Sequence, residues 1–316
     1  MRLVPVLFPC DLGHSAAGRY EEGGERGAPD MLLDVLEGEG VRFAPPLTVS
    51  VPVPSEDDPE DAPLKFDGSV TEAVVACADA VEQVNANGDF PIVLGGDHLG
   101  LLGQVLGHSR NHPEGIGLGV LCDAILDMET PAPPALGDVA KRKDPAFTST
   151  GDAERMVLAA AMGLLPEDTA LGKALQTTAV QPELVTVAGV RAPMNARVKA
   201  SAKASKADVW TMERIELDGE SSYRAVLLQH LAMGPTILSI DVGGLDPHLM
   251  TAVRDPVSDG LDWAFLRRTL EQCLPHVDRI LGLDICQLDP TRDDAHKGAL
   301  SRFAETIAPM LRRLTR

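Results

Sequence analysis

Short apolar runs alternate with amphipathic stretches along most of this chain. Runs of aliphatic and β-branched residues predict buried strands at Leu3–Phe8, Pro91–Leu94, Gly117–Cys122, Leu184–Gly189, Val209–Met212, Pro235–Asp241 and Arg279–Cys286. Apolar residues at three- and four-residue spacing predict helices at Asp30–Leu36, Ser69–Asn87, His98–Leu106, Gly151–Leu165, Ser221–Met233, Asp262–Leu274 and Ala299–Leu314. Such alternation, without a linker rich in Ser or Gly, predicts a single α/β domain over residues 1–316, built on a mostly parallel sheet.

Histidine and aspartate residues follow three of the predicted strands. His98 comes after the second run, Asp123 and Asp127 come after the third, and Asp241 ends the sixth. Because functional groups in open α/β sheets gather at the carboxyl ends of strands, we expect these side chains to lie together. One imidazole and several carboxylates predict a site for a hard or borderline divalent metal.

Composition narrows the choice of partners and compartment. The net charge of −19 and the pI near 4.7 exclude nucleic acid and anionic membranes as expected partners, because both would be repelled. The five cysteines form no C-x-x-C motif, and an odd number is typical of a reducing compartment. No apolar run reaches the length of about 18 residues that spans a membrane, and Met1–Pro9 predicts a strand rather than a signal peptide. We therefore expect a soluble, cytoplasmic protein.

Four motifs together resemble the ureohydrolase family of arginases, agmatinases and formiminoglutamases. They are Gly95–His98 (GGDH), Asp123–Asp127 (DAILD), Ser239–Pro247 (SIDVGGLDP) and Asp284–Pro290 (DICQLDP). Each motif alone is weak, but their order and separations also fit that family, which makes the set specific. The resemblance implies an arginase-like, three-layer α/β/α fold with an eight-stranded, mostly parallel sheet. It also implies a binuclear manganese site, homo-oligomers (trimers or hexamers), and hydrolysis of a guanidino or formimino C–N bond in a small molecule.

Two positions depart from the family's metal site. Ile125 stands where the family pattern has a histidine, and Gly243 stands where it has a second aspartate. The resemblance assigns the first metal to four residues that are all present: His98, Asp123, Asp127 and Asp241. It assigns the second metal to Asp123 and Asp241, which bridge the two metals, and to the two replaced positions. Neither isoleucine nor glycine has a donor atom in its side chain, so we expect one divalent metal per chain, most simply manganese, or none.

Further departures affect the residues that the family uses to bind substrate and to transfer protons. Glu154 aligns with the family's proton-shuttling histidine, and Asp138 is the other candidate. Gln287 stands where the resemblance expects the substrate-binding glutamate. A carboxylate binds a guanidinium through charge-assisted hydrogen bonds and a neutral amide does not, so guanidino substrates are disfavoured. His248, two residues after Asp246, is a candidate acid or replacement ligand.

Each of these features also has a structural interpretation. The polar cluster could be retained architecture, although carboxylates crowded together without a cation repel one another and raise their pKa values. Asp246, which precedes a proline, predicts a turn, and Asp97 predicts a cap for the following helix or loop. His108 and His112 have helical spacing but lie beside Pro113, which predicts a solvated loop.

Three functional hypotheses follow, and they leave open whether the chain is an enzyme. The first is a diverged family member with little or no ureohydrolase activity, which acts as a binding or regulatory subunit, alone or alongside an active paralogue. The second is a hydrolase with one metal that cleaves a C–N bond of an amidine or amide-like substrate without a guanidino group. Asp127 would then orient the attacking water, and Glu154, Asp138 or His248 would transfer protons. The third is a binuclear enzyme with substitute ligands such as His248. Replacement of both metal-binding and substrate-binding residues favours the first.

Overall fold

Eight parallel strands form one central sheet in the computed structural model, which describes residues 1–14, 24–55, 57–58, 62–131, 150–293 and 298–314. In chain order the described strands are β1 (Leu3–Phe8), β2 (Leu47–Thr48), β3 (Phe90–Gly95), β4 (Ile116–Val120), β5 (Val180–Val190), β6 (Asp208–Thr211), β7 (Thr236–Asp241) and β8 (Ile280–Cys286). Across the sheet their order is β2-β1-β3-β8-β7-β4-β5-β6, and every pairing between them is parallel. The predicted parallel sheet is confirmed.

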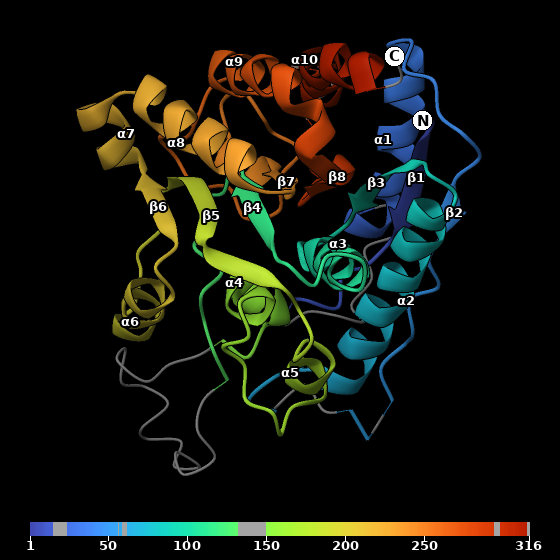
Figure 1. The fold of residues 1–316 in the computed structure, drawn as a ribbon, viewed down its shortest axis with the longest axis vertical. Helices are drawn as coiled ribbons and strands as arrows, with labels where there is room; N and C mark the ends of the chain where they lie inside the picture. Colours follow the sequence, from blue (N-terminus) through green and yellow to red (C-terminus); the bar gives the residue numbers. More distant parts are fainter. Residues whose placement is uncertain (15–23, 56, 59–61, 132–149, 294–297, 315–316) are drawn as a thin grey trace.

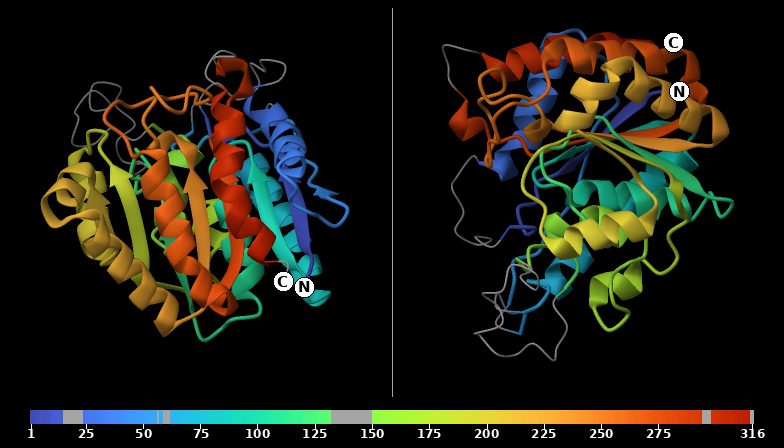
Figure 2. Two further views of the ribbon diagram at one scale, coloured as in Figure 1. Left: turned by 90° about the horizontal axis from the view of Figure 1, so that it is seen from above. Right: turned by 90° about the vertical axis from the view of Figure 1, so that its left-hand side faces the viewer.

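Helices cover both faces of the sheet and give the predicted three layers (Figures 1 and 2). One face carries α1 (Ala28–Gly38), α8 (Glu220–Met233), α9 (Trp263–Cys273) and α10 (Ala299–Leu314). The other carries α2 (Asp67–Ala86), α3 (Leu99–Ser109) and α4 (Val157–Ala161). The remaining described α-helices are α5 (Ala170–Ala174), α6 (Ala196–Ser205) and α7 (Met212–Asp218). None of the described helices is both long and apolar enough to cross a membrane.

The alternation of side chains along each strand divides the core into two hydrophobic clusters. In β3, Ile92 and Leu94 pack on the face of α1 and α10, whereas Val93 packs on the face of α2 and α3. All three residues are fully buried, so both faces of the strand lie in the core. This explains why these strands are apolar throughout rather than alternately polar.

The predicted helix over residues 151–165 is interrupted. Ala153–Met156 form a 3-10 turn, and α4 begins only at Val157. The carbonyl of Asp127 accepts hydrogen bonds from the amides of Leu158 and Ala159, so the start of α4 is bonded to the loop after β4. The short helices α5, α6 and α7 were not predicted, and most of the stretch between β4 and this turn, residues 132–149, lies outside the described residues.

Strand order brings the polar strand ends together at one edge of the sheet. Strands β3, β8, β7 and β4 are consecutive neighbours, and their arrows point to the same edge (Figure 2, left). In the register, Ser239 of β7 lies beside both Asp284 of β8 and Val120 of β4. The residues that follow these strands therefore share one edge, where open α/β sheets bind ligands.

Arg191, at the end of β5, fixes the segment after β7. Its guanidinium donates hydrogen bonds of 2.6–3.2 Å to six main-chain carbonyl groups: Gly189, Gly243, Gly244, Leu245, Val257 and Ser258. Its own amide donates to the carbonyl of Ala124 in the loop after β4. One residue thus ties the loops that follow β4, β5 and β7 to one another.

We expect Arg191→Met to lower the free energy of unfolding by about 2–4 kcal/mol, because several part-buried carbonyl groups would lose their donor. Urea denaturation followed by circular dichroism measures this. Arg110→Met is the matched control, because Arg110 forms only exposed ion pairs with Asp79 and Glu82 and its loss should cost less than about 1 kcal/mol. Equal effects of the two substitutions would contradict the role of Arg191.

Candidate functional site

The four predicted metal ligands lie together at the shared edge of the sheet. His98, Asp123, Asp127 and Asp241 are each at most 5% exposed. The Nδ1 atom of His98 lies 2.8 Å from an oxygen of Asp127 and 3.8 Å from an oxygen of Asp241. Donor atoms of His98, Asp123 and Asp127 all lie within 4.8 Å of one another. The structure thus brings together the residues that the strand ends predicted.

Asp123 and Asp241 each use one carboxylate oxygen in a hydrogen bond to the loop that follows, and both line a small pocket. One oxygen of Asp123 accepts the amide of Ile125 at 2.8 Å, and its other oxygen is buried without a hydrogen-bond partner among the described residues. One oxygen of Asp241 accepts the amide of Gly243 at 2.7 Å, which leaves the other to face His98. The pocket beside them has a volume of about 10 Å³, about the space of one water molecule or ion. A divalent cation fits this donor set, because it would pair the orphaned oxygen and neutralise the carboxylates.

Burial raises the pKa of each carboxyl group in the cluster. Asp123 is raised to about 8, first by burial and then by the neighbouring Asp127. The pKa values of Asp127 and Asp241 are also raised well above the usual range, chiefly by burial. A raised pKa means that the buried carboxylates favour a bound positive charge, either a proton or a cation in its place.

The positions of the second family metal contribute no side-chain donor. Ile125 and Gly243 both line the pocket, and their amides bind the carboxylates of the first donor set. His248 is exposed and is not among the residues that line the pocket; its amide donates to Asp246, as the predicted turn requires. Of the two metal positions that the resemblance implies, only the first therefore has its donor set among the described residues.

Ser239 and Asp284 orient His98 from the side away from the carboxylates. The hydroxyl of Ser239 donates to Asp284 at 2.9 Å, and Nε2 of His98 lies 3.2 Å from the same hydroxyl oxygen. Since that hydroxyl proton is directed to Asp284, Nε2 of His98 is the donor to Ser239, and the Nδ1 lone pair is left for a cation. Both residues belong to the strand-end motifs, but spacing alone did not predict this contact.

Glu154 is buried in a second charged cluster beside the pocket. Its carboxylate lies 2.6 Å from Nδ1 of His14, and Nε2 of His14 lies 2.9 Å from Glu25. Burial alone would lower the pKa of His14, but the two carboxylates raise it well above its usual value. Burial alone would raise the pKa of Glu154, but His14 lowers it to about 2. His14 therefore carries the positive charge of this cluster, and sequence analysis missed both His14 and Glu25.

Gln287 connects the two clusters. It lines the pocket, and its side-chain amide donates to Glu154 at 3.0 Å. A glutamate at this position could not donate that hydrogen bond and would place a second carboxylate beside the first. The backbone of Gln287 lies in the left-handed region with φ of 66°, which few residues other than glycine adopt. Its main-chain N–H donates to the carbonyl of Gly96. Asp138, the alternative to Glu154, lies outside the described residues.

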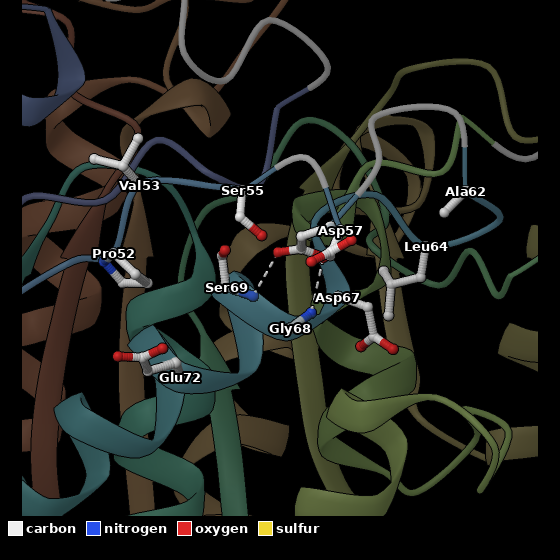
Figure 3. Close-up of a pocket in the computed structure, with 11 residues that line it drawn as sticks. Pro52, Val53, Ser55, Asp57, Ala62, Leu64, Asp67, Gly68, Ser69 and Glu72 are labelled. Atoms are coloured by element: carbon white, nitrogen blue, oxygen red, sulfur yellow. Dashed lines mark hydrogen bonds between the residues drawn. The ribbon is translucent and has the colours of Figure 1, made fainter.

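A larger acidic hollow beside α2 has a different role (Figure 3). It has a volume of about 590 Å³. Asp58 in its lining accepts hydrogen bonds from the amides of Gly68 and Ser69 in the first turn of α2. Asp67 accepts from the amides of Ala170 and Leu171 at the start of α5. These carboxylates stabilise helix N-termini, so the hollow carries no second reactive cluster.

Comparisons with known proteins identify the family of the chain. The arginase family model matches residues 4–311. The arginase of Brevibacillus brevis is 29% identical over 233 residues, which cover 72% of this chain and 71% of that protein. Arginase-1 of Homo sapiens is 28% identical over 246 residues, with coverage of 76% and 71%. The solved structure of the arginase from Bacillus caldovelox superposes with a TM-score of 0.81 at 23% identity and covers 98% of both chains. The chain therefore belongs to the arginase (ureohydrolase) family.

Proposed function

We propose that this arginase-family chain binds one divalent cation, most simply manganese, and has little or no arginase or agmatinase activity. It acts as a small-molecule-binding or regulatory protein. The observation that carries the proposal is the contrast within one pocket. Four donors are complete in His98, Asp123, Asp127 and Asp241, while Ile125 and Gly243 line the same pocket without donors.

The cation, when bound, would supply Lewis acidity toward a ligand oxygen. The chain's own residues determine which ligand fits beside it. The amide of Gln287 can hydrogen-bond a neutral group but cannot neutralise a guanidinium, and its N–H is already directed to Glu154. This combination supports a neutral ligand over arginine or agmatine.

A second candidate is a hydrolase with one metal that acts on an amidine or amide-like small molecule without a guanidino group. The observation that favours it is the buried pair of His14 and Glu154, joined to the pocket by Gln287. This pair holds one mobile proton close to the cluster, as a general acid requires. Against it, neither His14 nor Glu154 lines the pocket, and the connecting amide does not readily transfer protons. In this candidate Asp127 orients the attacking water, and His248 is a further candidate acid.

The proposal includes a cytoplasmic location and assembly into a homo-oligomer, a trimer or hexamer, without a nucleic-acid or membrane partner. Family membership supports assembly, and the net charge of −19 supports the absence of polyanionic partners. Association with an active paralogue is the partner that best fits a regulatory role.

We expect Mn²⁺ to raise the melting temperature of the wild-type protein, with saturation at one equivalent, because a ligand that binds only the folded state stabilises it by mass action. Differential scanning fluorimetry with a metal titration measures this. Asp123→Asn removes the orphaned oxygen and should abolish the rise. Asp246→Asn is the matched control, since Asp246 binds only main-chain amides, and it should respond like the wild type. An equal rise of the melting temperature in all three proteins would contradict the assignment of Asp123 to the Mn²⁺ site.

We also expect the Mn²⁺-loaded protein to release no urea from L-arginine or agmatine above a protein-free blank, because the second cation and the guanidinium-binding carboxylate are replaced. A colorimetric urea assay with the arginase of Bacillus caldovelox as positive control tests this. Release of urea at a comparable rate would refute the proposal. Ammonia release from formamide or acetamidine would favour the second candidate.

The His14–Glu154 pair predicts a pH effect with a definite sign. The folded-state pKa of His14 is raised above the unfolded value of about 6.5, so the pair stabilises the fold below that pH and loses this contribution as the pH rises through the folded pKa. NMR titration of labelled histidines should find His14 protonated at neutral pH, and Glu154→Gln should lower its pKa. Glu114→Gln, which alters only the exposed partner of His112, is the control. Titration of His14 near 6.5 in the wild type would contradict the assignment.

A further inference from the structure

Arg155 places a guanidinium in the candidate pocket. It belongs to the 3-10 turn before α4, and it lines the pocket together with Asp123, Asp127 and Asp241. Its side chain is 21% exposed, which is low for an arginine at a pocket mouth. Neither the strand-end motifs nor the proposed metal site assigns a role to this residue.

The guanidinium is held from two sides. It donates to Asp255 at 3.0 Å, and its Nε lies 3.5 Å from Glu154. The main chain is held as well, because the carbonyl of Arg155 accepts the amide of Glu129. The carbonyl of Asp127 binds α4, which follows Arg155 directly. These contacts hold both the main chain and the side chain of Arg155, and they fix its guanidinium beside the pocket.

Charge explains why an arginine is stable there. Burial lowers the pKa of Arg155, but the attraction of four carboxylates (Glu154, Asp127, Asp255 and Asp123) outweighs this effect. The net pKa is raised, so the guanidinium stays charged at every relevant pH. Four carboxylates, Asp123, Asp127, Asp241 and Asp255, share the pocket lining with this one fixed guanidinium, which offsets part of their charge before any cation binds.

We propose that Arg155 is a built-in positive charge of this pocket: its fixed guanidinium excludes cationic guanidino ligands and weakens the binding of a divalent cation. The inference deepens the proposed function, on whose one-cation site it rests. A guanidinium from solution would meet a fixed like charge, and such a juxtaposition costs several kcal/mol. A neutral amide or a carboxylate would not meet this repulsion. Arg155 is therefore the residue that determines the charge of the accepted ligand.

Two substitutions separate the charge of Arg155 from the space it fills. Arg155→Met fills most of the space without charge, and it should bind Mn²⁺ at least about tenfold more tightly than the wild type, because a nearby like charge is removed. Its stoichiometry should remain one, since Ile125 and Gly243 still offer no donors. Arg155→Ala opens the space, and it should bind free guanidinium, supplied as the chloride at millimolar concentration. Isothermal titration calorimetry of each variant, with and without Mn²⁺, gives both results.

The controls are Arg155→Lys, which keeps the charge, and Arg110→Met, which removes an arginine paired with two carboxylates far from the pocket. Both should bind Mn²⁺ as the wild type does and should not bind guanidinium. Circular dichroism verifies that each variant is folded, and Arg155→Gln replaces any variant that is not. Unchanged Mn²⁺ affinity in Arg155→Met together with no guanidinium binding in Arg155→Ala would overturn the inference. Binding of zero or two equivalents of Mn²⁺ by the wild type would contradict the proposed function. The guanidinium titration without Mn²⁺ would still test the role of Arg155 in that case.

Discussion

The mutual repulsion of three buried carboxylates is the constraint on which the rest of this site depends. Asp123, Asp127 and Asp241 are brought together by the order of β4 and β7 in the sheet, and all three are buried. Amides of the following loops bind one oxygen each of Asp123 and Asp241. The remaining charge must be neutralised by protons or by a cation. The loops can hold this geometry because Arg191 binds their carbonyl groups.

The charges around the pocket form two groups. In the inner group, Arg155 and the proposed cation offset most of the charge of Asp123, Asp127, Asp241 and Asp255. In the outer group, His14 and Arg254 offset Glu25 and Glu154. Gln287 lies between the groups as a neutral donor. A site of this kind has little capacity left for a cationic substrate, and this gives the replacement of the family's substrate-binding glutamate a physical reason.

The sequence predicted the fold and the meeting of His98, Asp123, Asp127 and Asp241 at one edge of the sheet, because both depend on local pattern. Apolar runs identify buried strands, and polar residues directly after them must lie at the carboxyl edge. The interactions of Arg155, Arg191 and His14 could not be predicted, because each depends on how loops far apart in the chain fold over that edge. The same limit applies to helix breaks: the turn at Ala153–Met156 follows from hydrogen bonds to the loop after β4, which no helical periodicity records.

Burial of polar residues was also difficult to predict. His108 was expected in a solvated loop, but it lies at the end of α3, almost fully buried, and its ring binds Asn85 and Gln104. Its partners come from its own helix and from the neighbouring α2, so only the packing of the two helices shows that the ring is satisfied inside the protein. Asp97 was easier to predict. Its cap depends on a residue only two positions away, and the amide of Leu99 donates to its carboxylate as expected.

The central claim is that this arginase-family pocket binds a single divalent cation. The most direct measurement is a crystal structure of protein saturated with Mn²⁺, with anomalous scattering recorded at the manganese edge. The account predicts one anomalous peak per chain, bounded by His98, Asp123, Asp127 and Asp241, with the guanidinium of Arg155 beside it. Two peaks in the pocket, or none at full saturation, would contradict it.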